Sequence, residues 1–332
     1  MTIQRLRDQR AGSRGVTLVE LMVALAISLV VVLAATALYL STRESQRVLD
    51  ENNAAHEAGS FALRVVGREL MNAGFYPVVR VESAALANVL GTYTNITGQA
   101  AYEFGVFGCE GAVFDPATGT CPAATANAPD SLVVAYFTSD AFGTSVGQRA
   151  DCTGTDVGLA AVNVPRVGAV AAGQAPTQPL LVANRYSLAD EVVTIEGRNL
   201  NTRSLACDGN GTDAVNYQRI ISGIDDLQIT YGIYNDDSLA VTRFFRADEV
   251  APLGTQTING NPVGPWGRVA AVRVCVIART FETAVTTGTA GGTQLTYQDC
   301  NGAQVAQPLA DRSIRRTYVQ VFGVRNRQTS TY

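Results

Sequence analysis

The most regular feature of the chain is an apolar run from Val16 to Leu40, which is interrupted only by Glu20. A helix of about 25 residues rises about 37 Å, which exceeds the hydrocarbon core of a bilayer, about 30 Å thick. We therefore expect a membrane-spanning helix. A secretory signal is the alternative, because residues 34–37 offer small side chains for cleavage, but such a signal has a shorter apolar core.

Apolar and small residues continue at helical spacing beyond Leu40, now with charges on the other faces. The pattern predicts one helix from Val16 to Ala73, ended by Gly74 as a left-handed cap. Gly59 and Gly67 oppose its continuity by about 1 kcal/mol each. The second half of this helix is expected to pack on the remainder of the chain.

The remainder is rich in Val, Ile, Tyr and Phe between polar and Gly/Pro-rich stretches. This pattern predicts an α+β fold, with the helix laid on one face of an antiparallel sheet that has long loops. The expected strands are Ser131–Phe137, Leu180–Ala183, Glu191–Ile195, Gln218–Ser222, Leu227–Tyr234, Arg243–Arg246, Val269–Thr280 and Thr317–Val324. The expected loops include Asp115–Pro129, Ala169–Pro179 and Thr286–Gly292.

Charge is distributed unevenly along the chain. Residues 1–15 carry four arginines against one aspartate, so the rest of the chain, by difference from the total of −4, carries −7. Positive residues before the apolar run predict a single pass with the N-terminus in the cytoplasm and the body of the protein outside. An acidic body disfavours nucleic acid as a partner.

Composition also limits the chemistry. The chain has no lysine, and its single histidine, His56, lies in a polar helical stretch where a solvated surface position is expected. Lysine-dependent chemistry is therefore excluded, and a Ser-His-Asp triad would have to use His56. No motif of a known catalytic class is present, so we expect neither enzymatic activity nor a cofactor.

Glu20 is costly at bilayer depth, by about 2.5–3.5 kcal/mol. A cut between Gly15 and Val16 would create an amino group one helical turn before Glu20, on the same face. The stretch from Arg14 to Ala24, RGVTLVELMVA, resembles the class III signal of type IV pilins and type II secretion pseudopilins. The resemblance implies that prepilin peptidase cuts after Gly15, that Val16 is N-methylated, and that Glu20 guides assembly. Val16 departs from the usual phenylalanine.

Three further stretches are similar to the PilW family of minor pilins. They are Arg68–Gly74 at the helix end, Ile221–Gly232, and Trp266 with the strand after it, completed by Val321–Arg327. The resemblance implies a minor pilin of the priming or tip complex that starts pilus assembly, with roles in twitching motility and adhesion. A J-type pseudopilin of type II secretion and a pilus-tip adhesin remain alternatives.

The family pattern divides the chain into a leader (1–15), a transmembrane or filament-core helix (16–40), the periplasmic half of the helix (41–74) and a β-rich periplasmic head (75–332). The implied partners are other minor pilins, the major pilin, prepilin peptidase and the inner-membrane assembly platform. After assembly, the protein is expected in the pilus and at the cell surface.

The six cysteines all follow residue 100 and form no CxxC pair, which favours disulfides in an oxidising compartment. Six cysteines allow fifteen connectivities. Nearest-neighbour pairing is our hypothesis: Cys109–Cys121, Cys152–Cys207 and Cys275–Cys300.

Two acidic stretches are candidate ligand sites. Oxygen-bearing side chains occur at alternate positions, Asp208, Asn210 and Thr212, as they do in calcium-binding loops. The EF-hand template, however, needs a glycine where this chain has Asp213 and a glutamate where it has Arg219. We therefore expect a turn there and no metal. The pair Asp225–Asp226 is expected to be a solvated turn ahead of a strand whose residues Leu227, Ile229 and Tyr231 face the core.

Overall fold

The computed structural model describes most of the chain, which divides into two compact units, Met1–Asp50 and Glu51–Tyr332. Each unit is considered by itself. The described residues are 15–75, 105–138, 150–155, 157, 180–195, 197–211, 215–236, 238, 240–258, 260–281, 294–309, 311 and 313–328.

The long helix is confirmed as α1 (Leu18–Asn72), which begins in the first unit and ends in the second. Gly74 follows it with a φ of 69°, the left-handed conformation expected of a cap. The Gly74 N–H also donates to the Ala135 carbonyl at 2.9 Å, so the helix end is fixed to a strand. Within the second unit, α1 buries a stripe of small and apolar residues that includes Ala62, Val66 and Leu70.

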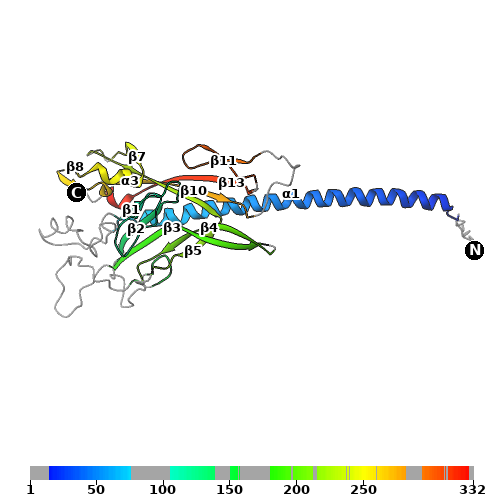
Figure 1. The fold of residues 1–332 in the computed structure, drawn as a ribbon, viewed down its shortest axis with the longest axis horizontal. Helices are drawn as coiled ribbons and strands as arrows, with labels where there is room; N and C mark the ends of the chain where they lie inside the picture. Colours follow the sequence, from blue (N-terminus) through cyan, green and yellow to red (C-terminus); the bar gives the residue numbers. More distant parts are fainter. Residues whose placement is uncertain are drawn as a thin grey trace, which may run out of the picture. The chain divides into compact units, whose positions relative to one another are not determined.

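The first large sheet has five antiparallel strands in chain order (Figure 1). They are β1 (Val106–Cys109), β2 (Ser131–Thr138), β3 (Leu180–Ile195), β4 (Arg198–Asp208) and β5 (Gln218–Ser222). Pairing of β2 with β3 stops at Tyr186, whereas β3 and β4 pair as far as Ile195 and Arg198. The β3–β4 hairpin therefore extends beyond its neighbours as a two-stranded arm.

The second large sheet has four antiparallel strands in the order β13-β10-β6-β7. They are β6 (Ile224–Ile233), β7 (Arg243–Phe245), β10 (Val269–Arg279) and β13 (Arg315–Gly323). Two small hairpins are β8 (Gln256–Ile258) with β9 (Asn261–Val263), and β11 (Thr296–Gln298) with β12 (Gln304–Ala306). The short helices are α3 (Ala247–Val250), η2 (Ala251–Leu253), η3 (Trp266–Arg268) and α4 (Arg325–Gln328).

One hydrophobic core joins α1 to both large sheets. Leu70 on α1, Leu132 and Leu205 in the first sheet, and Ile229 and Val274 in the second are each at most 1% exposed. The fold class is α+β, as expected, but the head contains two large sheets instead of the single one predicted. The chain crosses between them at Gly223, whose φ of 81° forms the corner between β5 and β6.

Several expected strands are confirmed: β5 has the predicted bounds, and β10 ends one residue early. Other expectations were wrong. Leu180–Ala183 and Glu191–Ile195 are parts of the single strand β3, and the long strand β4 was not anticipated. The expected loop Asp115–Pro129 contains only an isolated bridge, and the other two expected loops lie outside the described residues.

Candidate functional site

The first candidate site is the N-terminus of α1, where Thr17 and Glu20 form a capping box. The Glu20 carboxylate accepts hydrogen bonds from the Thr17 N–H and hydroxyl, both at 3.1 Å. The Glu20 N–H in turn donates to Thr17 Oγ1 at 3.2 Å. These bonds satisfy amide groups that a helix leaves unpaired at its start. The carboxylate is therefore held at the end of the helix, toward Gly15 and Val16.

Gly15 and Val16 precede the first helical turn and are exposed. A Cβ added to Gly15 would contact nothing within 4 Å. The bond between them is thus accessible in the described chain and adjacent to the capped helix. The preceding residues of the expected leader, 1–14, lie outside the described residues.

The apolar part of α1 is the one described helix that is long and apolar enough to cross a membrane. Its leucines and valines between residues 18 and 40 are each more than half exposed in this unit. An exposed apolar surface of this size is typical of a membrane or protein interaction site.

At its other end, α1 is bound to the head by a buried polar contact. Asn184 on β3 donates from Nδ2 to the Glu69 carboxylate at 2.7 Å, and its Oδ1 accepts from the Cys152 N–H at 2.9 Å. Burial raises the pKa of Glu69, although the Asn184 hydrogen bond and Arg68 oppose the shift. Asn184 thus connects the helix to a disulfide-bearing segment.

The six cysteines form three disulfides, and the pairs are those of the nearest-neighbour hypothesis. Cys109–Cys121 closes the loop after β1, with 5.4 Å between the Cα atoms. Cys152–Cys207 attaches the segment around residue 152 to β4, and Cys275–Cys300 attaches the turn of the β11–β12 hairpin to the middle of β10. No described cysteine is free.

The weak metal candidates hold structural contacts. Asp208 makes a buried ion pair with Arg185 at 2.8 Å. The Asn210 side chain accepts from the Ala183 N–H and donates to the Leu181 carbonyl, both at 2.9 Å. Thr212 lies outside the described residues. Among the described residues, no group of three or more His, Cys, Asp or Glu side chains is placed to hold a metal ion.

His56 is exposed, as expected of a surface histidine, and its Nδ1 lies 3.2 Å from the Tyr318 hydroxyl. The expectation for Asp225–Asp226 was wrong, because both residues lie within β6. Asp225 pairs with Arg315 at 2.6 Å and with Arg279 at 3.6 Å. Burial lowers the pKa of Arg315, but the neighbouring Asp225 and Asp311 carboxylates raise it by more, so that the pKa lies above its ordinary value.

Comparison with known proteins identifies the head. Residues 185–326, which run from within β3 to the start of α4, match the family model of the type IV pilus-assembly protein W. Residues 10–36 match the prokaryotic N-terminal methylation motif, which contains the Gly15–Val16 junction and Glu20. The chain is a type IV pilin-like protein whose residues 185–326 match the PilW family.

Other comparisons add little to the PilW assignment. A type IV-like pilin from Thermus thermophilus aligns over 84% of this chain and 98% of its own, with 10% identity and a TM-score of 0.33. No curated protein matches the sequence. The PilW match covers both strands of the β3–β4 arm and all four strands of the second sheet.

The sequence reasoning missed Thr17 as a functional neighbour of Glu20. The signal was present, because Thr-x-x-Glu at the start of an apolar run is the pattern of a capping box. It also missed the contact between Glu69 and Asn184, which are 115 residues apart. No local pattern indicates such a pair.

Proposed function

We propose that this type IV pilin-like protein is a minor pilin of the type IV pilus that joins the priming complex and remains at the filament tip. The observation that supports this most is the N-terminal arrangement of an accessible Gly15–Val16 bond, a capping box with Glu20, and a long exposed apolar helix. The expected role is structural, without catalysis or a cofactor.

The proposed pathway begins with prepilin peptidase, which cuts after Gly15 and methylates the new amine on Val16. Cutting removes a leader that carries a net charge of +3. The Glu20 carboxylate then lies close to a cation on its own chain, or accepts one from a neighbouring subunit in the membrane. Pairing lowers the cost of a carboxylate at this depth, and it favours lateral association of helices.

Before assembly, the proposed location is the bacterial inner membrane, with residues 16–40 spanning it once and the N-terminus in the cytoplasm. Residues 41–74 and the head, 75–332, would lie in the periplasm, where disulfides are stable. The proposed partners are other minor pilins, the major pilin and the inner-membrane assembly platform. After assembly, the head would reach the cell surface with the pilus.

A clean deletion of the gene tests this proposal. We expect the deletion to abolish surface pili and twitching. The intact gene should restore both, and a gene that carries Glu20→Gln should not. Normal piliation with blocked secretion of folded exoproteins would instead assign the protein to type II secretion as a J-type pseudopilin. Normal piliation with reduced attachment would assign it as a tip adhesin. Either of these two outcomes overturns the priming role.

A further inference from the structure

The outer face of the second sheet forms the floor of an open groove of about 1240 Å³. Successive residues of a strand alternate between faces, so Val272, Val274 and Val276 of β10 enter the core while their neighbours line the groove. The groove-facing residues of the floor are Asp226, Gln228 and Thr230 on β6 and Arg273, Cys275 and Ile277 on β10.

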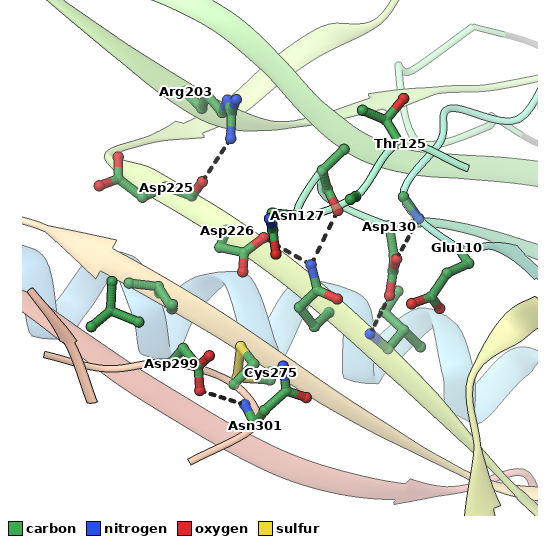
Figure 2. A pocket seen from close by; sticks show the side chains of 18 of the residues that line it. Glu110, Thr125, Asn127, Asp130, Arg203, Asp225, Asp226, Cys275, Asp299 and Asn301 are labelled. Carbon is green, nitrogen blue, oxygen red and sulfur yellow. Dashed lines mark hydrogen bonds between the residues drawn. A yellow bond between two sulfur atoms is a disulfide. The ribbon is translucent and has the colours of Figure 1, made fainter. Parts of the chain in front are cut away.

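Both walls of this sheet groove are fixed covalently. On one side, Cys300 ties the β11–β12 hairpin to Cys275 in the floor. On the other side, the segment between Cys121 and Asp130 is held by the Cys109–Cys121 disulfide. Asp130 then accepts hydrogen bonds from the Gly111 N–H at 2.8 Å and the Ile229 N–H at 2.7 Å (Figure 2). The groove is therefore preformed, which reduces the entropy lost when a ligand binds.

The lining has an excess of negative charge. It contains seven carboxyl groups and four guanidinium groups, which is a formal net charge of −3 when every acid is ionised. Three of the four arginines already pair with acids of the groove, as Arg203 with Asp190, Arg246 with Asp248, and Arg315 with Asp225. The fourth, Arg273, has no ion-pair or hydrogen-bond partner among the residues that the structure describes.

Two polar atoms of the lining need a hydrogen-bond partner. Glu110 Oε2 and Thr230 Oγ1 are inaccessible to solvent, and each lacks a hydrogen-bond partner among the described residues, whereas Glu110 Oε1 lies 3.8 Å from the Arg246 guanidinium. Burial raises the pKa of Glu110, and the nearby Asp248 raises it further. Burial likewise raises the pKa of Asp226. An unpaired buried acceptor is unfavourable, and a charged donor is the partner that would stabilise it most.

We propose that the sheet groove binds an arginine- or lysine-bearing segment of a partner protein. Its cationic groups would donate to the carboxylates around Glu110 and Asp226, while Gln228 Oε1 and the Asn301 side chain would bind an extended backbone, since Gln228 Nε2 already donates to Ala128 and Asp226. This inference concerns the surface of the head, and it does not depend on the pilus role of the protein.

Removing the charge of Arg273 tests the proposal, because the change in affinity has opposite signs for cationic and anionic ligands. Arg273 is exposed in the floor and repels a cationic ligand, so its removal should strengthen binding. An anionic ligand, such as a carboxylated sugar, would use Arg273 as its anchor, and the same change would then weaken binding. The direction of the effect of Arg273→Ala therefore separates the two kinds of ligand.

The experiment uses the full chain in detergent micelles and a fluorescein-labelled octapeptide with two arginines among glycine and serine. Peptides with glutamine or glutamate in place of arginine are the comparisons, and fluorescence anisotropy measures Kd. The variants are Asp226→Asn and Arg273→Ala, with Glu57→Gln as the control, because Glu57 is an exposed acid on α1 outside the groove. Circular dichroism verifies that each variant is folded.

We expect the arginine peptide to bind at least about tenfold more tightly than the glutamine peptide at about 0.05 M salt, and less tightly at about 0.5 M salt. Asp226→Asn should weaken binding at least about threefold, Arg273→Ala should tighten it by a similar factor, and Glu57→Gln should leave it unchanged. Equal binding of the arginine and glutamine peptides, an equal effect of Glu57→Gln, or weaker binding by Arg273→Ala would overturn the proposal.

Discussion

The aromatic ring of Phe322 on β13 occupies the space in which a side chain at Gly67 of α1 would lie. Tyr318, which precedes Phe322 on the same strand, occupies the corresponding space beside Gly59. The two glycines, which weaken a helix in isolation, are thus the positions at which α1 approaches the second sheet closely enough for aromatic packing.

Gly67→Ala is therefore expected to destabilise the protein, although alanine is the better helix former. A gain of about 1 kcal/mol in helix propensity is outweighed by overpacking, which costs about 1–3 kcal/mol and grows if the ring must leave its position. Urea unfolding measures the difference. Gly323→Ala is the control, because a Cβ there contacts nothing within 4 Å. A Gly67→Ala variant that is more stable than the parent would contradict the packing argument.

These glycines also show what the sequence could and could not predict. The apolar run and helical stripe predicted α1 almost to its ends, and the Val-rich β10 was equally clear. Strand β4, RNLNTRSLACD, is polar in its first half and has few β-branched residues, so its conformation depends on pairing with β3 and β5. Asp225 was misread because its arginine partners lie 54 and 90 residues further along the chain.

The candidate sites likewise include residues that a local sequence pattern indicates and residues that only the fold brings together. Gly15, Val16 and Glu20 could be proposed from the sequence because their motif is local, and the methylation-motif match covers them. The sheet groove combines side chains from six or more separate segments, so no spacing in the sequence reveals it. The disulfide pairs matched the simplest hypothesis because each links cysteines that are neighbours along the chain, and among the possible pairings these give the shorter loops, which close at lower entropic cost.

Asp130 predicts the pH dependence of stability. Burial raises its pKa from an ordinary 3.8 to about 7, aided by Glu110 and Asp226, and this outweighs its two backbone hydrogen bonds. The folded state therefore binds the proton more tightly than the unfolded state. The stabilising contribution is fully present below about pH 4 and is lost as the pH rises through about 7.

The parent protein should consequently be more stable at pH 5 than at pH 8, with Asp130 contributing about 1–3 kcal/mol of the difference. Urea unfolding at both pH values measures it. In Asp130→Asn, which does not titrate, the difference between the two pH values should shrink by that amount. An unchanged difference in the variant would show that Asp130 does not carry the effect.

The contact between Glu69 and Asn184 predicts opposite outcomes for two substitutions at one position. Glu69→Gln keeps an oxygen that can accept from Asn184 and removes a carboxyl whose burial raises its pKa, so stability near neutral pH should be retained. Glu69→Ala leaves the Asn184 amide unpaired and should cost about 1–3 kcal/mol. Thermal melting compares them, and equal melting temperatures would contradict a role for this hydrogen bond.

Gly15 predicts the outcome of leader processing. Because a Cβ at Gly15 would contact nothing within 4 Å among the described residues, Gly15→Leu should fold normally and leave the apolar helix intact. We expect the substitution to block cleavage, so that the leader remains attached. Mass spectrometry of the N-terminus measures the result. A product that begins at a methylated Val16 in this variant would rule out peptidase recognition of Gly15.

Glu20 offers the sharpest separation of roles, because its carboxylate both caps α1 and is proposed to pair with an amine. Thr17→Ala removes both hydrogen bonds of the Thr17 hydroxyl and keeps the charge of Glu20, whereas Glu20→Gln removes the charge and keeps an acceptor for the Thr17 N–H. If charge pairing drives assembly, Thr17→Ala should still enter pili and Glu20→Gln should not, although both are cleaved. Immunoblotting of sheared pili and of membranes, with the intact chain beside them, measures this. Equal loss of both variants from pili would assign the role of Glu20 to the helix cap, and equal incorporation would leave neither contact necessary for assembly.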